Sequence, residues 1–236
     1  MHLGVFQDYI LAVLWFCIDD DIWGARGHQP EQQHRFQAAL ALKAMLMKWY
    51  KEERRRNPGR PLYELGDFSL KTMGSHDKPA LVGVKAAESG TLLRFAVSLA
   101  EEYRHRLARG GALVAAGRGL VKYLDATRQA PLRLPAAKRQ ALTDGLVECM
   151  ANRVSAGVPF KPKLHLCTHI PKDAKSFGDP CATGTWVDEG LNSKLAAVCA
   201  SARSAVWSER VLGTFAHSAG PTARAAESRG EKQRNA

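Results

Sequence analysis

The most regular stretch of the chain is residues 81–103, LVGVKAAESGTLLRFAVSLAEEY. Its positions at steps of three and four residues are Leu81, Val84, Glu88, Leu92, Phe95, Leu99 and Tyr103, and all of them except Glu88 are apolar or aromatic. Residues at this spacing share one face of an α-helix, so the stretch predicts an amphipathic helix. Gly110 and Gly111 predict where this helix stops. We therefore expect a fold built from helices that pack by apolar stripes.

Glu88 lies on the same stripe as these apolar residues. A carboxylate on a buried face must be paired, protonated or functional. Lys85 is three residues away and offers a local partner. Glu88 is therefore either half of a local ion pair or part of a polar site.

The segments on either side repeat the helical pattern. Residues 3–18 are apolar nearly all round, which predicts a buried helix, although their aromatic and β-branched content leaves a strand open over part of the run. Residues 30–56 predict a helix with Pro30 in its first turn. Helices are also predicted over 112–127 and 136–156, on either side of Pro131 and Pro135. Residues 57–79 form a loop-rich connector with room for a short strand at 62–65 or 68–73.

These patterns predict a mainly α protein, an irregular helical bundle of about six helices with little or no sheet. We divide it into a helical domain over residues 1–160, a terminal helical segment over 161–215 and a tail over 216–236. The tail is small, polar and rich in Arg and Lys without periodicity, so we expect it to be disordered and basic.

The composition narrows the class of partner. The chain has 236 residues, 45% of them hydrophobic, and carries a net charge of +11 from 34 Lys and Arg against 23 Asp and Glu. This excess favours a polyanionic partner such as nucleic acid, with plain solubility as the alternative. Its five cysteines form no closely spaced framework, which indicates a reducing compartment. The apolar run 9–18 is too short to span a bilayer, so we expect a soluble intracellular protein without a membrane partner.

A block of cations closes the predicted helix 30–56. It consists of Lys48, Lys51, Arg54, Arg55, Arg56 and Arg60. Cations at a helix C-terminus are favoured by the helix dipole, which explains the block without any function. Trp49 and Tyr50 lie beside it, and aromatic with cationic groups together suit base stacking and phosphate contact. The block is our candidate nucleic-acid-binding surface.

Groups of catalytic type gather in residues 161–212, KPKLHLCTHIPKDAKSFGDPCATGTWVDEGLNSKLAAVCASARSAVWSERVL. His165 and His169 are four residues apart, and with Glu88 they are the candidate polar site. Asp188 and Glu189 precede an apolar-periodic run, which predicts a further helix with both acids in its first turn.

The sequence gives little support for a metal site. The two histidines could ligate zinc together with Cys167 or Cys181, but structural zinc sites use four ligands at tighter spacing. Neighbouring side chains on a helix point apart, so Asp19, Asp20 and Asp21 predict a solvated helix end rather than a cation site. We expect no bound metal and no cofactor.

Two short motifs resemble a known family. Met1-His2-Leu3-Gly4-Val5 is similar to the segment that follows the second catalytic aspartate of RNase H-like, DDE-type transposases of eukaryotic mobile elements. The spaced residues Lys163-Leu164-His165, His169, Phe177-Gly178, Trp186, Glu189 and Lys194 resemble the end of that nuclease core. The resemblance implies that the helical block is an insertion between the catalytic acids, and that the protein is nuclear and binds nucleic acid.

The same resemblance implies that Glu189 is the third catalytic acid, with Asp188 as the competing assignment. The first two aspartates would precede Met1, so we expect a transposase-derived fragment that is catalytically incomplete. A divalent metal such as Mg²⁺ would then bind only if those aspartates were restored. The alternatives are an α-helical protein-interaction module without a nucleic-acid role, and a hydrolase built on His165, His169 and Glu189.

Overall fold

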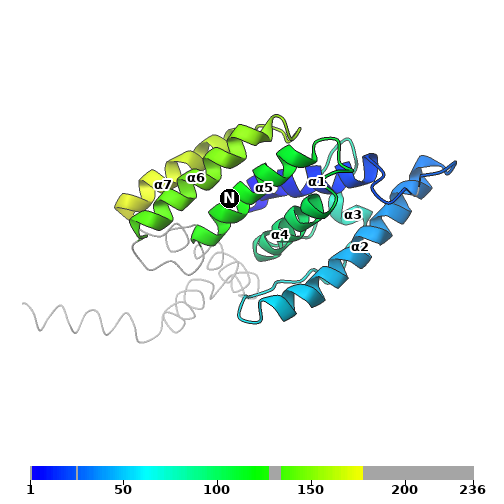
Figure 1. The fold of residues 1–236 in the computed structure, drawn as a ribbon, viewed down its shortest axis with the longest axis horizontal. Helices are drawn as coiled ribbons and strands as arrows, with labels where there is room; N and C mark the ends of the chain where they lie inside the picture. The colour runs from blue at the N-terminus through cyan, green and yellow to red at the C-terminus, as the bar shows by residue number, and fades with distance from the viewer. Residues whose placement is uncertain (1, 25, 128–133, 178–236) are drawn as a thin grey trace, which may run out of the picture. The chain divides into compact units, whose positions relative to one another are not determined.

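The helices pack in a chain of neighbours, in which α1 lies against α4, α4 against α5, α5 against α6 and α6 against α7 (Figure 1). The computed structural model describes residues 2–24, 26–127 and 134–177. In chain order the elements are η1 (His2–Phe6, a π-helix), α1 (Gln7–Asp19), α2 (Glu31–Arg56), α3 (Leu70–Met73), α4 (Ala86–Glu102), α5 (Gly110–Thr127), α6 (Ala136–Arg153) and α7 (Pro162–Phe177). They belong to a unit that spans Met1–Thr183, so the predicted boundary at residue 160 falls inside it. The prediction of a mainly α protein is confirmed.

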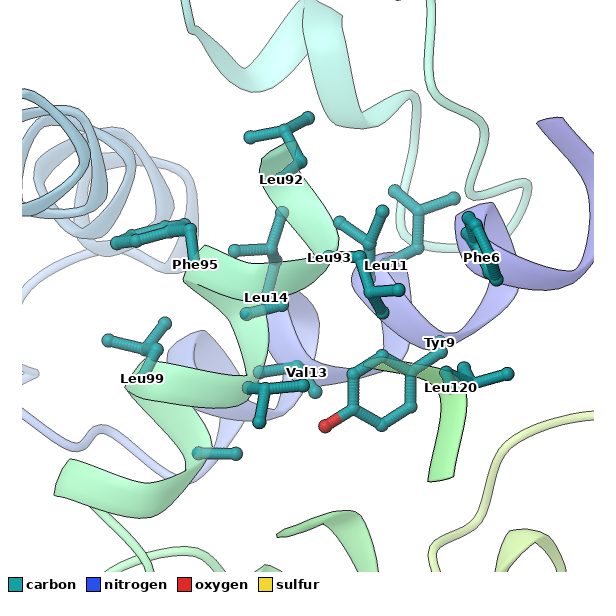
Figure 2. Packing of buried hydrophobic residues seen from close by; sticks show 14 of the residues in the cluster. Phe6, Tyr9, Leu11, Val13, Leu14, Leu92, Leu93, Phe95, Leu99 and Leu120 are labelled. Atoms are coloured by element: carbon teal, nitrogen blue, oxygen red, sulfur yellow. The ribbon is translucent and has the colours of Figure 1, made fainter. Parts of the chain in front are cut away.

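The core forms where α1 meets α4. Figure 2 shows apolar side chains of η1 and α1 facing those of α4, and the α1 residues Ile10, Val13 and Leu14 are fully buried. Leu92, Leu93 and Leu99 of α4 are equally buried. Because α1 is covered on nearly every side, its sequence is apolar all round rather than amphipathic, as the run 3–18 predicted.

The predicted helix 81–103 is wrong at its start. Helix α4 begins at Ala86, because Gly83 adopts a left-handed φ of +73° and the N–H of Val82 donates to the carbonyl of Thr72 at 3.0 Å. Leu81 and Val84 still pack in the core, but from a loop. At the other end, α4 stops at Glu102, and Gly110 is the first residue of α5 rather than the end of the preceding helix.

Neither predicted strand forms. Residues 70–73 make the one-turn helix α3, and the N–H of Ser69 donates to the hydroxyl of Thr72 at 3.1 Å. Within the described ranges the nearest approach to a sheet is a single antiparallel bridge between Gly74 and Pro79.

Glycines set the spacing of the central helices. A Cβ on Gly119 of α5 would lie 2.5 Å from the carbonyl oxygen of Gly145 of α6, and one on Gly145 would lie 2.6 Å from that of Gly119. A Cβ on Gly117 would lie 2.1 Å from the hydroxyl of Tyr9, which donates to the carbonyl of Leu113 at 2.9 Å. Because these three glycines have no side chain, α5 packs closely against both α6 and α1.

A buried arginine ties the end of α6 to the start of α1. Arg153 is 1% exposed, and its Nε donates to the carbonyl of Pro159 at 2.8 Å. One Nη atom lies 3.5 Å from the carboxylate of Asp8, too poorly aligned for a hydrogen bond, so this contact is an ion pair only. Lys161 also contacts that carboxylate, at 2.6 Å. The cluster compensates a charge that the interior would otherwise reject.

Among the helices of residues 2–24, 26–127 and 134–177, none combines the length and the apolar character needed to cross a membrane.

Candidate nucleic-acid interface

The predicted basic block lies on the last turns of α2 and the loop that follows. The side chains of Lys48, Arg54 and Arg56 are 80%, 61% and 68% exposed. Helix α2 ends where predicted, since Asn57-Pro58-Gly59 cannot continue it. The six cations therefore form one exposed surface, which we call the α2-end surface: Lys48, Lys51, Arg54, Arg55, Arg56 and Arg60.

Four of these six cations already have acidic partners. Arg56 contacts Glu52 at 3.1 Å and Arg60 contacts Glu53 at 3.2 Å. Arg54 is paired with Glu64, and Lys48 lies 3.9 Å from Glu52. Exposed pairs of this kind contribute little to stability, so they remain free to rearrange around a ligand.

The other two cations on the α2-end surface are unpaired. Lys51 and Arg55 are one turn apart on the exposed face of α2, and neither has an ion-pair partner in the described part of the chain. A positive group without a carboxylate neighbour offers its full charge to a phosphate.

Of the two predicted aromatic partners of the block, Tyr50 is wrong. Tyr50 is 2% exposed, its hydroxyl accepts the N–H of Leu65 at 3.3 Å, and burial raises its pKa to about 12. Trp49 packs edge-on against Phe95 with ring centroids 5.9 Å apart. Tyr50 is therefore not available for stacking on a base, whereas Trp49 is half-buried and lines two of the hollows beside α2.

Tyr63 is the aromatic side chain that the structure places at this surface. It is 48% exposed and lies in the loop after α2. Together with Arg56, Arg60 and Lys138 it lines a hollow of about 690 Å³. Asp125 is the one acidic residue among the described residues that line this hollow. The sequence signal was an aromatic residue in the Pro- and Gly-bearing loop Asn57–Tyr63, directly after a basic helix end.

The hollow continues along the groove between α2 and α4. A second hollow of about 410 Å³ shares Arg56 and Arg60 with the first and reaches Arg118 and Lys122 of α5. Its carboxylates are held in place: Glu101 accepts from Arg118 at 2.7 Å, and Asp125 is paired with Arg94, whose side chain is only 9% exposed. The groove therefore combines cations with fixed acids.

Glu88 lies apart from the histidines it was grouped with. It is in the first turn of α4, and its carboxylate accepts the backbone N–H of Lys85 at 2.7 Å. Because the helix starts at Ala86, the residue that was predicted on the apolar stripe instead satisfies a free N–H at the helix end. Its role is structural.

His165 and His169 both lie on α7, four residues apart as predicted, and His169 is exposed. Among the described residues, no three His, Cys, Asp or Glu side chains are grouped as a metal would require. Cys167 is buried on the same helix, and burial raises its pKa to about 11, which keeps it a thiol rather than a thiolate ligand. Cys181, Asp188 and Glu189 lie outside the described residues, so the assignment of the third acid stays a prediction.

The three consecutive aspartates at the end of α1 bind three different segments. Asp19 contacts His76 at 3.1 Å, Asp20 accepts the N–H of Ala108 at 2.9 Å, and Asp21 contacts the buried His34 at 3.2 Å. They diverge from one another, as expected for neighbours at a helix end. Their role is to anchor loops around the end of α1.

A second group of cations was not predicted from the sequence. The turn between α4 and α5 carries Arg104, Arg106 and Arg109, all exposed. Only the glycines that follow were interpreted, although three arginines within six residues are themselves a signal of an anion-binding surface. Comparisons with protein-family models, with curated proteins and with solved structures gave no match to this chain, so the transposase family rests on the short sequence motifs alone.

Proposed function

We propose that this chain binds nucleic acid with little sequence preference, through the α2-end surface and the hollow beside it. The observation that carries the proposal is the position of Tyr63, an exposed aromatic ring among Arg56, Arg60 and Lys138. Binding of single strands without sequence readout combines these two features, cations for the backbone and a ring on which a base stacks.

The charges at this surface suit transient contact with phosphates. Lys51 and Arg55 are unpaired, and the side chains of Arg54 and Arg56 are exposed, so a phosphate can compete with their acidic partners. Each phosphate contact releases counterions, so the affinity of such a surface falls steeply as salt rises. A groove with fixed carboxylates on one side limits how far the ligand extends over α5.

The test is binding of a fluorescently labelled single-stranded 20-mer of mixed sequence, followed by anisotropy between 50 and 200 mM salt. We expect Tyr63→Leu to weaken binding by about 1–3 kcal/mol per stacked base. The double variant Lys51→Gln/Arg55→Gln should lower the slope of log affinity against log salt by about 2, one for each lost contact.

Lys43→Gln is the matched control, because Lys43 lies on the same helix but is paired with Asp67 at 2.7 Å. It should bind as the parent does. Absence of binding by the parent chain at 50 mM salt would overturn the proposal. An equal loss of affinity per removed charge in Lys51→Gln/Arg55→Gln and in Lys43→Gln, with no loss in Tyr63→Leu, would show that only net charge matters.

A protein-interaction module is the second candidate, and one observation favours it. Phe36 and Leu40 are 57% and 51% exposed and lie one turn apart on α2. Exposed apolar pairs of this kind are typical of a partner helix site. Under this alternative, Phe36→Ser/Leu40→Ser abolishes partner binding, while the nucleic-acid variants leave it unchanged.

We include a transposase origin in the proposal because two short sequence motifs of this chain resemble that family. It accounts for a helical nucleic-acid-binding block and for an acid at residue 189, and the fold described here is compatible with a helical insertion. Cleavage by Glu189 is testable in a longer chain that carries two catalytic aspartates upstream of Met1, where Glu189→Gln should abolish metal-dependent cleavage and leave DNA binding intact.

A further inference from the structure

The turn between α4 and α5 differs electrostatically from the α2-end surface. Arg104, Arg106 and Arg109 are exposed, with His105 between them. None of the three guanidinium groups has an ion-pair partner in the described ranges. Asp20 accepts the N–H of Ala108 in the turn, and Glu101 pairs with Arg118. The turn therefore brings together three arginines without ion-pair partners among the described residues, whereas the α2-end surface has two such cations, Lys51 and Arg55.

We infer that residues 103–109, the arginine turn, are the principal phosphate-contacting surface of this chain, and that a nucleic-acid strand reaches it from the α2 end. The inference rests on the proposed function and deepens it by naming the path of the backbone. Its ligand class is the sugar–phosphate backbone, because arginine forms paired hydrogen bonds with phosphate oxygens.

The turn holds its arginines in a fixed arrangement. Leu107 is 4% exposed and anchors the middle of the turn in the core. Its N–H donates to the carbonyl of Tyr103 at 3.1 Å, and the N–H of Gly110 donates to the carbonyl of Leu107 at 3.0 Å. A backbone that is ordered before binding costs less entropy when the ligand arrives.

Gly110 is required for this conformation. A Cβ at residue 110 would lie 2.1 Å from the carbonyl oxygen of Arg104, closer than any real contact. The chain therefore folds back tightly enough to place Arg104 over the start of α5. The dipole of α5 adds positive potential at the same place.

A third hollow brings the α2 end close to the arginine turn. It has a volume of about 400 Å³, shares Trp49 and Arg56 with the groove described above, and is also lined by Lys48, Glu52, Glu102 and Tyr103. Arg104 is the next residue along the chain after Tyr103. A strand that stacks on Tyr63 and passes Arg56 therefore comes within one residue of Arg104 in the arginine turn.

A protein partner fits this surface less well. The large apolar side chains that are strongly exposed in the described residues all lie outside residues 103–109, namely Phe36, Leu40, Tyr63, Val82, Val147, Val154 and Phe160. Stable protein interfaces need an apolar or aromatic centre, whereas phosphate contact needs only positioned cations. The arginine turn supplies positioned cations and lacks an apolar or aromatic centre.

The experiment compares Arg104→Gln/Arg106→Gln with the parent and with Lys71→Gln/Lys78→Gln in the full chain. Lys71 and Lys78 are also exposed cations without ion-pair partners in the described part, so the control loses the same charge elsewhere. Arg109 is left intact because its guanidinium covers the ring of Phe16, 5.5 Å from the centroid. Circular dichroism checks that each variant keeps the helical content of the parent.

We expect the arginine variant to lose at least tenfold in affinity for the labelled 20-mer at 50 mM salt, and its salt slope to fall by about 2. The control should lose less than threefold. If the parent binds and the two variants lose affinity equally, the inference is wrong and the proposed function stands. If the parent binds anionic phosphatidylserine vesicles or polyglutamate but not the 20-mer, both the inference and the proposed function are wrong.

Discussion

At the scale of single residues, Gly117 is a position where α5 has no room for a side chain. A Cβ there would lie 2.1 Å from the hydroxyl of Tyr9 and 2.6 Å from a methyl of Val97. Gly117→Ala should therefore lower the free energy of unfolding by about 1–3 kcal/mol, despite the better helix propensity of alanine. Gly59→Ala is the control, since nothing lies within 4 Å of its would-be Cβ. Equal urea midpoints for both variants would contradict the packing of Tyr9 on α5.

Asp8 is the second residue whose loss has a clear expected cost. Its side chain is 9% exposed and faces Arg153, which is 1% exposed. Asp8→Asn leaves the arginine charge buried without compensation, so we expect about 3 kcal/mol of destabilisation in urea unfolding. Glu31→Gln removes a carboxylate from the exposed pair with Arg35 and should cost less than about 0.5 kcal/mol. A loss at Asp8 no larger than that at Glu31 would show that Arg153 is compensated by other groups.

Side-chain environments were the hardest property to predict from sequence. The periodicity placed Glu88 and Tyr50 correctly on helices, but burial depends on which face meets another element. Tyr50 followed a basic run and was interpreted as exposed, whereas its ring packs inward and its hydroxyl binds the N–H of Leu65. Tyr63 lies in a loop without periodicity, so its one signal was its place in a Pro- and Gly-bearing loop directly after a basic helix end.

At the scale of elements, the crossing of α5 and α6 depends on two glycines that face each other. Gly119→Ala and Gly145→Ala should each destabilise the fold, because each new Cβ meets the backbone of the other helix at about 2.5 Å. Once one alanine has pushed the helices apart, the second should cost less. A double-mutant cycle measured in urea should therefore show a coupling of about 0.5–3 kcal/mol, and strictly additive losses would contradict the close crossing.

Helix existence was predictable, and helix ends were less so. The apolar stripes of residues 30–56 and 136–156 come within a few residues of α2 and α6, since Pro30 and Pro135 mark the starts of both. The start of α4 was not predictable from the stripe, because Leu81 and Val84 are core residues at helical spacing in a loop. The sequence signal was Gly83, which lies between these two residues. Its left-handed φ of +73° interrupts the helix that the spacing predicted.

At the scale of the whole molecule, buried titratable groups predict instability in alkali. Burial raises the pKa of Tyr50 from 10.0 to about 12 and that of Cys167 from 9.0 to about 11. In the unfolded chain both groups lose their protons at lower pH, so their contribution is complete below pH 9 and is lost as the pH rises to about 12. The free energy of unfolding in urea should fall between pH 9 and 11.

Tyr50→Phe isolates part of this alkaline effect. The variant loses the hydrogen bond from Leu65 and should be slightly less stable at pH 8, by about 1 kcal/mol. Its stability should then decline less steeply than that of the parent as the pH approaches 11. Parallel pH profiles for the two proteins would show that the hydroxyl of Tyr50 is accessible to water in the folded state.

The central claim is that the α2-end surface and the arginine turn contact one nucleic-acid strand. Its most direct test is ultraviolet crosslinking of the full chain to a single-stranded 20-mer, with the crosslinked peptides identified by mass spectrometry. The account predicts crosslinks in the peptides that contain Tyr63 and residues 103–109, lost when salt is raised to 500 mM. Crosslinks confined to α6 and α7, or crosslinks that persist unchanged at high salt, would contradict it.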